Sequence, residues 1–105
     1  MSRVAVISAV LDEPEKCQQE FNKILGGFKG IIKGRMGIPF DDEGVSVISV
    51  TVVGDMDTIN NLTGKLGKIP SVSIKTSVSK KEIRGWFYEF KFSTSICKST
   101  YRTIW

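Results

Sequence analysis

The sequence predicts a single α+β domain in which the order strand, helix, strand occurs twice. Residues 3–11 and 45–53 are apolar runs rich in valine, isoleucine and alanine, and each is followed by a segment with helical periodicity and then by another strand. The 105 residues suffice for one domain with its own core. Together these observations predict a βαββαβ sandwich over residues 1–80, followed by an extension over 81–105.

The four predicted strands differ in how many of their faces are apolar. The strands at 3–11 and 45–53 are apolar at both alternating sets of positions, as strands buried on both faces are. The strands at 30–38 and 71–78 alternate apolar with polar residues, which is typical of sheet edges. A hairpin loop at 39–44 joins the second strand to the third. We therefore predict an antiparallel sheet in the order 4-1-3-2 with two helices on one face, the ferredoxin-like arrangement.

Two amphipathic segments carry helix start and stop signals. The first spans 13–26, with the capping-box pattern Asp12-Glu-Pro-Glu15 at its start and a glycine pair at its end. The second spans 56–66, with Asp55 or Asp57 as its N-cap and a glycine directly after it. The apolar positions of both segments recur at the spacing of a stripe buried against a sheet.

The predicted arrangement leaves one face of the sheet without helices. The strands at 3–11 and 45–53 nevertheless place apolar residues on that face. An exposed apolar surface of that size is typical of an interaction site. Two coverings are open at this point: a second copy of the chain packed sheet against sheet, or the C-terminal extension folded over the face.

Residues 81–105 differ from the rest of the chain in charge and aromatic content. They hold five Lys and Arg against two Asp and Glu, whereas residues 1–80 hold ten against nine. Seven of the ten aromatic residues also lie there. These two changes place a boundary near Lys80. Beyond it we expect an extra strand at 86–92, with its aromatic side chains on one face, and then an irregular segment.

The residue types exclude several kinds of chemistry. Histidine is absent, which excludes Ser-His-Asp and Cys-His catalytic devices within one chain. Cys17 and Cys97 lie far apart, outside any metal-binding spacing, and Cys17 is expected in the core as a small apolar residue. The acidic run Asp41-Asp-Glu43 is most simply a solvated loop. We therefore expect no metal site and no cofactor.

The chain also lacks sequence features of membrane insertion and export. No apolar run approaches the roughly 18 residues that a membrane-spanning helix needs. The start of the chain lacks the basic and apolar segments of a signal peptide. We therefore expect a cytoplasmic protein with no membrane partner.

The glycine-rich segment 26–37 is the candidate ligand site. Its backbone can approach a small anionic ligand, with Lys33 or Arg35 as the counter-charge and Gly37 beside them. Arg35 is the residue most suited to hold a carboxylate of a ligand or of a protein partner. On the other interpretation the glycines end a helix and relieve a curved edge strand, while Lys33 and Arg35 are exposed charges that deter aggregation. In both cases these two cations are expected to face away from the apolar residues of the same strand, Ile32, Met36 and Ile38.

Three stretches resemble a family of regulators of the iron-only hydrogenase system. They are Arg3-Val-Ala-Val-Ile7, Gly34-Arg-Met-Gly-Ile-Pro39 and the run 57–76, which carries the second helix, its stop and the start of the fourth strand. Such proteins resemble stand-alone relatives of ACT domains and of the regulatory domain of nickel-responsive repressors. The resemblance covers residues 3–80. It implies a ferredoxin-like fold, assembly through sheets into a homodimer or higher oligomer, and a regulatory role, such as regulation of transcription, rather than a catalytic one.

The sequence departs from those relatives at two points that matter for ligands. Nickel-responsive regulators use histidines and a cysteine, and this chain has no histidine. ACT domains that bind amino acids usually have a glycine in the loop after the first strand, where this chain has Asp12-Glu-Pro-Glu15. There is also no DNA-binding helix or ribbon before residue 3, so direct operator binding is expected to need the tail or a partner protein.

Three functions follow from these observations, in decreasing order of support. The leading one is a non-enzymatic regulatory module that oligomerises through its sheet and senses a small molecule or a regulatory protein. The second is nucleic-acid binding by the basic aromatic tail, because the first and third strands lack the aromatic residues on which bases stack. The last is a small enzyme of the acylphosphatase type. The acidic turn at 12–15 disfavours it, because that chemistry needs a phosphate-binding loop with arginine.

Overall fold

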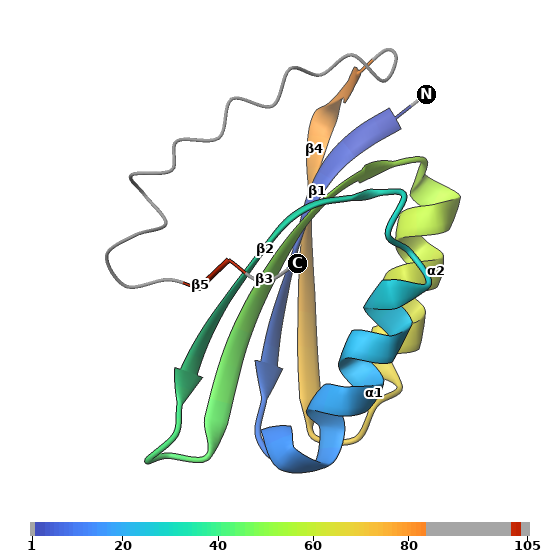
Figure 1. The fold of residues 1–105 in the computed structure, drawn as a ribbon. Helices are drawn as coiled ribbons and strands as arrows, with labels where there is room; N and C mark the ends of the chain where they lie inside the picture. The colour runs from blue at the N-terminus through green and yellow to red at the C-terminus, as the bar shows by residue number, and fades with distance from the viewer. Residues whose placement is uncertain (1, 84–101, 104–105) are drawn as a thin grey trace.

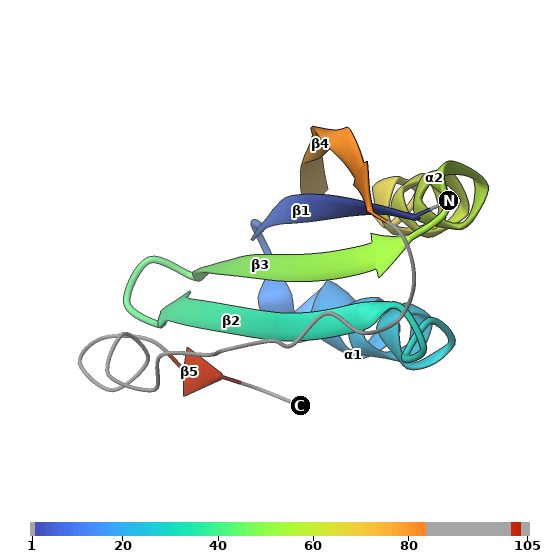
Figure 2. The same ribbon diagram turned by 90° about the horizontal axis from the view of Figure 1, so that it is seen from above.

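The structure, a computed structural model, describes residues 2–83 and the backbone of 102–103, and consists of a twisted sheet with two helices on one side (Figures 1 and 2). In chain order its elements are β1 (Ser2–Leu11), α1 (Pro14–Gly26), β2 (Ile32–Phe40), β3 (Val45–Gly54), α2 (Met56–Gly67), β4 (Val72–Ile83) and β5 (Arg102–Thr103).

The strand order in the sheet is β4-β1-β3-β2-β5, and every neighbouring pair is antiparallel. The central pair is β1 and β3, which face each other without a break from Arg3 opposite Gly54 to Leu11 opposite Ser46. The ferredoxin-like βαββαβ fold and the predicted order 4-1-3-2 are confirmed. β5 adds a short pairing on the outer edge of β2, where Thr103 lies opposite Met36.

The core lies between the helices and the helix-facing side of the sheet. It draws one alternating set of residues from each central strand and the apolar stripe of each helix. Its largest wholly buried side chains are Phe21, Ile7, Leu11, Ile48, Ile59, Leu62, Leu66, Val50 and Val52. Cys17 is buried among them, as predicted, and burial raises the pKa of its thiol.

β2 contains a bulge that reverses which of its residues face the helices. Ile32 lies opposite Val52, but the next paired residue is Gly34, opposite Thr51, so Lys33 is an extra residue in this strand. After the bulge, Arg35 pairs with Val50 of the core and so lies on the helix-facing side. The prediction that Arg35 faces away from Ile32 was therefore wrong. The same shift moves Met36 and Ile38 to the side of the sheet without helices.

The start of α1 also differs from the prediction. The N-cap is Glu13, with no capping hydrogen bond from its side chain, so the capping box at 12–15 was wrong. The Asp12 amide instead donates to the Ser71 carbonyl at 2.8 Å, and the Ser71 hydroxyl donates to the Glu13 carboxylate at 3.2 Å. A contact between two distant turns therefore replaces the local cap. Ser71 adopts a left-handed backbone conformation, with φ 67°, to make it.

The start of α2 is as predicted. The Asp55 carboxylate accepts a hydrogen bond from the Thr58 amide at 2.7 Å, which caps the helix. This hydrogen bond to the charged form lowers the pKa of Asp55.

The fourth strand is longer than predicted. β4 runs from Val72 to Ile83, which is longer than the predicted 71–78 and extends past Lys80. The predicted strand at 86–92 lies outside the described residues.

Replacing Asp55 by alanine is expected to lower stability at neutral pH and to have less effect in acid. Because the folded pKa of Asp55 is depressed, its contribution is present above its unfolded pKa of about 4 and is lost as pH falls through the lower folded value. Urea unfolding of the wild type and Asp55→Ala at pH 7 and at decreasing pH checks this. Asp57→Ala is the matched control, and an equal loss in both variants would assign the effect to charge near the helix start rather than to the cap.

Candidate functional site

The side of the sheet without helices is the first candidate for a functional surface. We call it the open face and define it by the outward-facing residues of the four long strands (Figure 1). These residues are Val4, Val6, Ser8 and Val10 of β1, Val45, Val47, Ser49, Thr51 and Val53 of β3, Met36, Ile38 and Phe40 of β2, and Ser73, Lys75 and Ser77 of β4.

The strand register arranges the open face in rows across the sheet. One row is Ser73, Val10, Val47 and Ile38, and the next is Lys75, Ser8, Ser49 and Met36. In these rows the apolar side chains lie on the central strands and β2, while the single charge, on Lys75, lies on β4. The open face therefore has an apolar centre and a polar margin on its β4 side.

Two side chains of the open face are unusually exposed for apolar residues. Val10 is 36% exposed and Phe40 is 46% exposed. Both lie toward the end of the sheet that holds the β2–β3 hairpin. These exposed apolar residues make the open face a candidate interaction surface.

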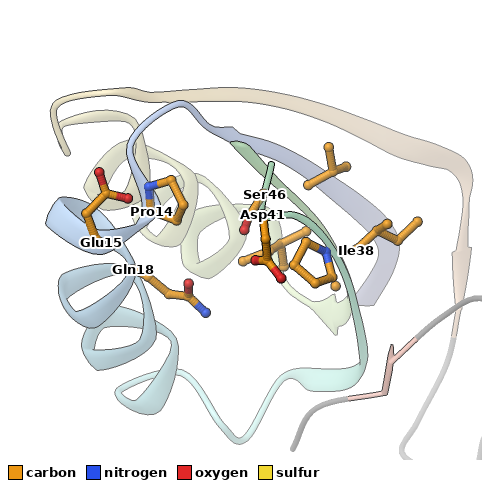
Figure 3. A pocket seen from close by; sticks show the side chains of 10 residues that line it. Pro14, Glu15, Gln18, Ile38, Asp41 and Ser46 are labelled. Atoms are coloured by element: carbon orange, nitrogen blue, oxygen red, sulfur yellow. The ribbon is translucent and has the colours of Figure 1, made fainter. Parts of the chain in front are cut away.

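A pocket between α1 and the β2–β3 hairpin is the second candidate (Figure 3). Its volume is about 400 Å³, within the range of small-molecule sites. The residues that line it are Pro14, Glu15 and Gln18 of α1, Gly37, Ile38 and Pro39 of β2, Asp41 of the hairpin loop, and Ser46, Val47 and Ile48 of β3.

The structure does not gather the three predicted ligand residues in this pocket. Gly37 lines it, but Lys33 and Arg35 do not. Arg35 instead points at α1, where a guanidinium nitrogen donates to the Asn22 amide oxygen and the guanidinium carbon lies 6.0 Å from the centre of the Phe21 ring. Whether Lys33, Arg35 and Gly37 bind a ligand stays a prediction.

Arg35 is half-buried in this position. Burial lowers the pKa of its guanidinium, which nevertheless stays charged. Its Nε is buried and has no hydrogen-bond partner in the described part of the chain. The placement is explained by the bulge at Lys33, which turns Arg35 toward the helices.

Within residues 2–83 and 102–103, no group of three or more Asp, Glu, Cys or His side chains could hold a metal ion. In the same residues, no helix is long and apolar enough to cross a membrane. The acidic loop residues Asp41, Asp42 and Glu43 are exposed.

The sequence and the fold were compared with those of known proteins. A sequence model of the TM1266-like family, described as "Iron-only hydrogenase system regulator, putative", matches residues 3–76. This chain belongs to the TM1266-like family.

Among solved structures, the uncharacterized protein TM1266 from Thermotoga maritima is similar to this chain. The two are 34% identical in sequence with a TM-score of 0.73, and the match covers 76% of this chain and 100% of that chain. No curated protein matches. All residues that line the pocket lie within residues 3–76, the stretch that matches the family model. All residues of the open face except Ser77 lie within the same stretch.

Sequence reasoning missed the pocket, because its polar residues come from three separate segments. One signal was present. The residues of β3 that face the helices are Ser46, Ile48, Val50 and Val52. A serine as the first of these otherwise apolar residues is a candidate for contact with a polar group.

The contact between Arg35 and α1 is expected to stabilise the fold. In a double-mutant cycle, Arg35→Met and Asn22→Ala should show a coupling of about 1 kcal/mol, the usual net contribution of one hydrogen bond. Urea unfolding of the four proteins measures it. As a control, Lys29→Met combined with Asn22→Ala should be additive. Additivity in both cycles would show that the Arg35 contact contributes nothing.

Proposed function

We propose that this protein is a non-enzymatic regulatory module of an iron-only hydrogenase system and that it acts as a homo-oligomer assembled through the open face. The description of the TM1266-like family supports the regulatory role. The open face supports the assembly, because the two helices cover only the opposite side of the sheet (Figure 1).

A second copy of the chain suits the open face better than a charged partner would. The rows through Val10, Val47 and Ile38 are apolar at their centre, and Lys75 lies on β4 at their margin. Two such faces can meet without burying an unpaired charge, which would be costly. An apolar centre with a polar rim is also the usual composition of an interface between identical subunits.

Val10→Glu tests the assembly. Val10 is exposed and lies between Val47 and Ser73, so the substitution places a carboxylate in the apolar centre with little strain on the core. Light scattering coupled to gel filtration should give a mass of two or more chains for the wild type and 11.7 kDa for Val10→Glu.

Asn61→Glu is the matched control, because it adds the same charge at an exposed position of α2. Its mass should equal that of the wild type. A monomeric wild type, or an oligomer that Val10→Glu leaves intact, would contradict assembly through the open face. Covering of the face by the C-terminal extension would give the first of these results.

The regulatory role has a separate test in the native host. Deleting the gene should change hydrogenase activity, and the wild-type and Asn61→Glu genes should restore it. Because regulation is proposed to need the oligomer, Val10→Glu should fail to restore it at equal protein level. Hydrogenase activity that does not respond to the deletion would refute the regulatory role.

A further inference from the structure

Ser46 is an anomaly in the core of the domain. It is 9% exposed and is the only buried polar side chain in the described part of the chain. It continues the helix-facing set of β3, whose next members Ile48 and Val50 are wholly or almost wholly buried. Its hydroxyl makes no side-chain hydrogen bond within the described residues. The hydroxyl oxygen is not among the wholly enclosed polar atoms that lack a partner, where the described residues hold only Arg35 Nε, so there must be a reason why solvent reaches it.

The pocket supplies that reason, because Ser46 lines it. Figure 3 shows the Ser46 side chain between the hairpin and α1, and the Gln18 side chain reaching from α1 toward the same space. Asp41 reaches in from the hairpin loop, and Glu15 lies at the helix end of the pocket. A ligand in this space would replace water as the partner of the Ser46 hydroxyl.

The charge of the lining decides the charge of the ligand. Glu15 and Asp41 contribute two carboxylates, and among the described side chains no lysine or arginine lines the pocket. Neither carboxylate forms an ion pair with a described residue. The start of α1 opposes them with a partial charge of roughly +0.5, which is smaller than two full negative charges. The lining therefore favours a cation, whereas the ligand expected at Gly37 from the sequence was an anion.

The shape and chemistry of the remaining lining favour an organic cation over a metal ion. Two proline rings, of Pro14 and Pro39, and the Ile48 side chain give the pocket apolar walls. Its volume of about 400 Å³ is far larger than an ion needs. An ammonium group has three donors, and the hydroxyl of Ser46, the amide oxygen of Gln18 and the carboxylate of Asp41 are three acceptors.

We propose that the pocket between α1 and the β2–β3 hairpin binds a small alkylammonium ion. Its charged head would donate hydrogen bonds to Ser46, Gln18 and Asp41. The Glu15 carboxylate would add to the negative potential around that head, and the alkyl chain would lie on Pro14 and Pro39. This inference rests on the proposed function in one respect: if the protein is a regulatory module, the alkylammonium ion is the signal that it senses. Binding is measured apart from assembly, so either can fail alone.

The test is a titration of the full-length chain followed by ¹H–¹⁵N NMR. n-Butylammonium chloride should cause saturable shifts of the amides of Ser46, Gln18 and Asp41. Sodium butyrate, of similar size and opposite charge, should not. Saturation by butyrate, no saturable response to n-butylammonium, or saturation by calcium chloride alone would overturn the proposal.

Three variants assign the binding to the pocket. Ser46→Ala and Asp41→Asn should each weaken n-butylammonium binding about tenfold, the effect of losing one hydrogen bond to a charged group. Asp42→Asn removes the neighbouring carboxylate of the same loop, which does not line this pocket, and should leave binding unchanged. Equal effects of Asp41→Asn and Asp42→Asn would show attraction to the acidic loop in general and would refute the site.

Ser46→Ala also distinguishes a ligand role from a structural one. Without the amine, the variant should be at least as stable as the wild type in thermal unfolding, because the hydroxyl has no partner to lose. With saturating n-butylammonium, the wild type should gain more stability than the variant. A variant that is less stable without amine would show that Ser46 has a structural partner and would remove the basis of the proposal.

Discussion

The pairing of β1 with β3 is the constraint on which the rest of this structure depends. The two strands face each other without interruption from Arg3–Gly54 to Leu11–Ser46, and both are apolar on both sides. Their helix-facing side chains, such as Ile7 and Val50, are wholly buried and anchor α1 and α2. Neither helix reaches the valines on the other side. The core does not require those valines, because serine or threonine at the same positions would leave the helix-facing side unchanged. The proposed assembly through the open face would give them a role.

The bulge in β2 sets the chemistry of the space between the sheet and α1. Without the extra residue at Lys33, Arg35 would lie on the open face and would place a second charge in its apolar rows. With it, Arg35 contacts Asn22 and Phe21, and Met36 and Ile38 extend the apolar surface. One inserted residue thus turns the charge of Arg35 toward α1 and keeps it off the apolar open face.

The sequence was sufficient to predict the features that depend on local pattern. The strands at 3–11 and 45–53 were recognisable as central because both of their faces are apolar. Asp55 was recognisable as one of two candidate caps, with Asp57, from its place at the start of α2. The bulge was not predictable, because its only mark is one residue in a glycine-rich segment. The start of α1 was mispredicted because the partner of Asp12 and Glu13 is Ser71, far along the chain. The pocket depends on the same kind of distant contact, since helix, loop and strand meet there only in three dimensions.

Two strands, β2 and β3, contribute to both the pocket and the open face. Alternation along β3 places Ser46 in the core beside the pocket and its neighbours Val45 and Val47 on the open face, and Ile38 and Val47 contribute to both. A ligand on one side and a subunit on the other would therefore be separated by the thickness of a single sheet. If both sites are occupied as proposed, any preference of the ligand for the assembled state must equal the preference of the assembled state for the ligand, because binding free energies are reciprocal.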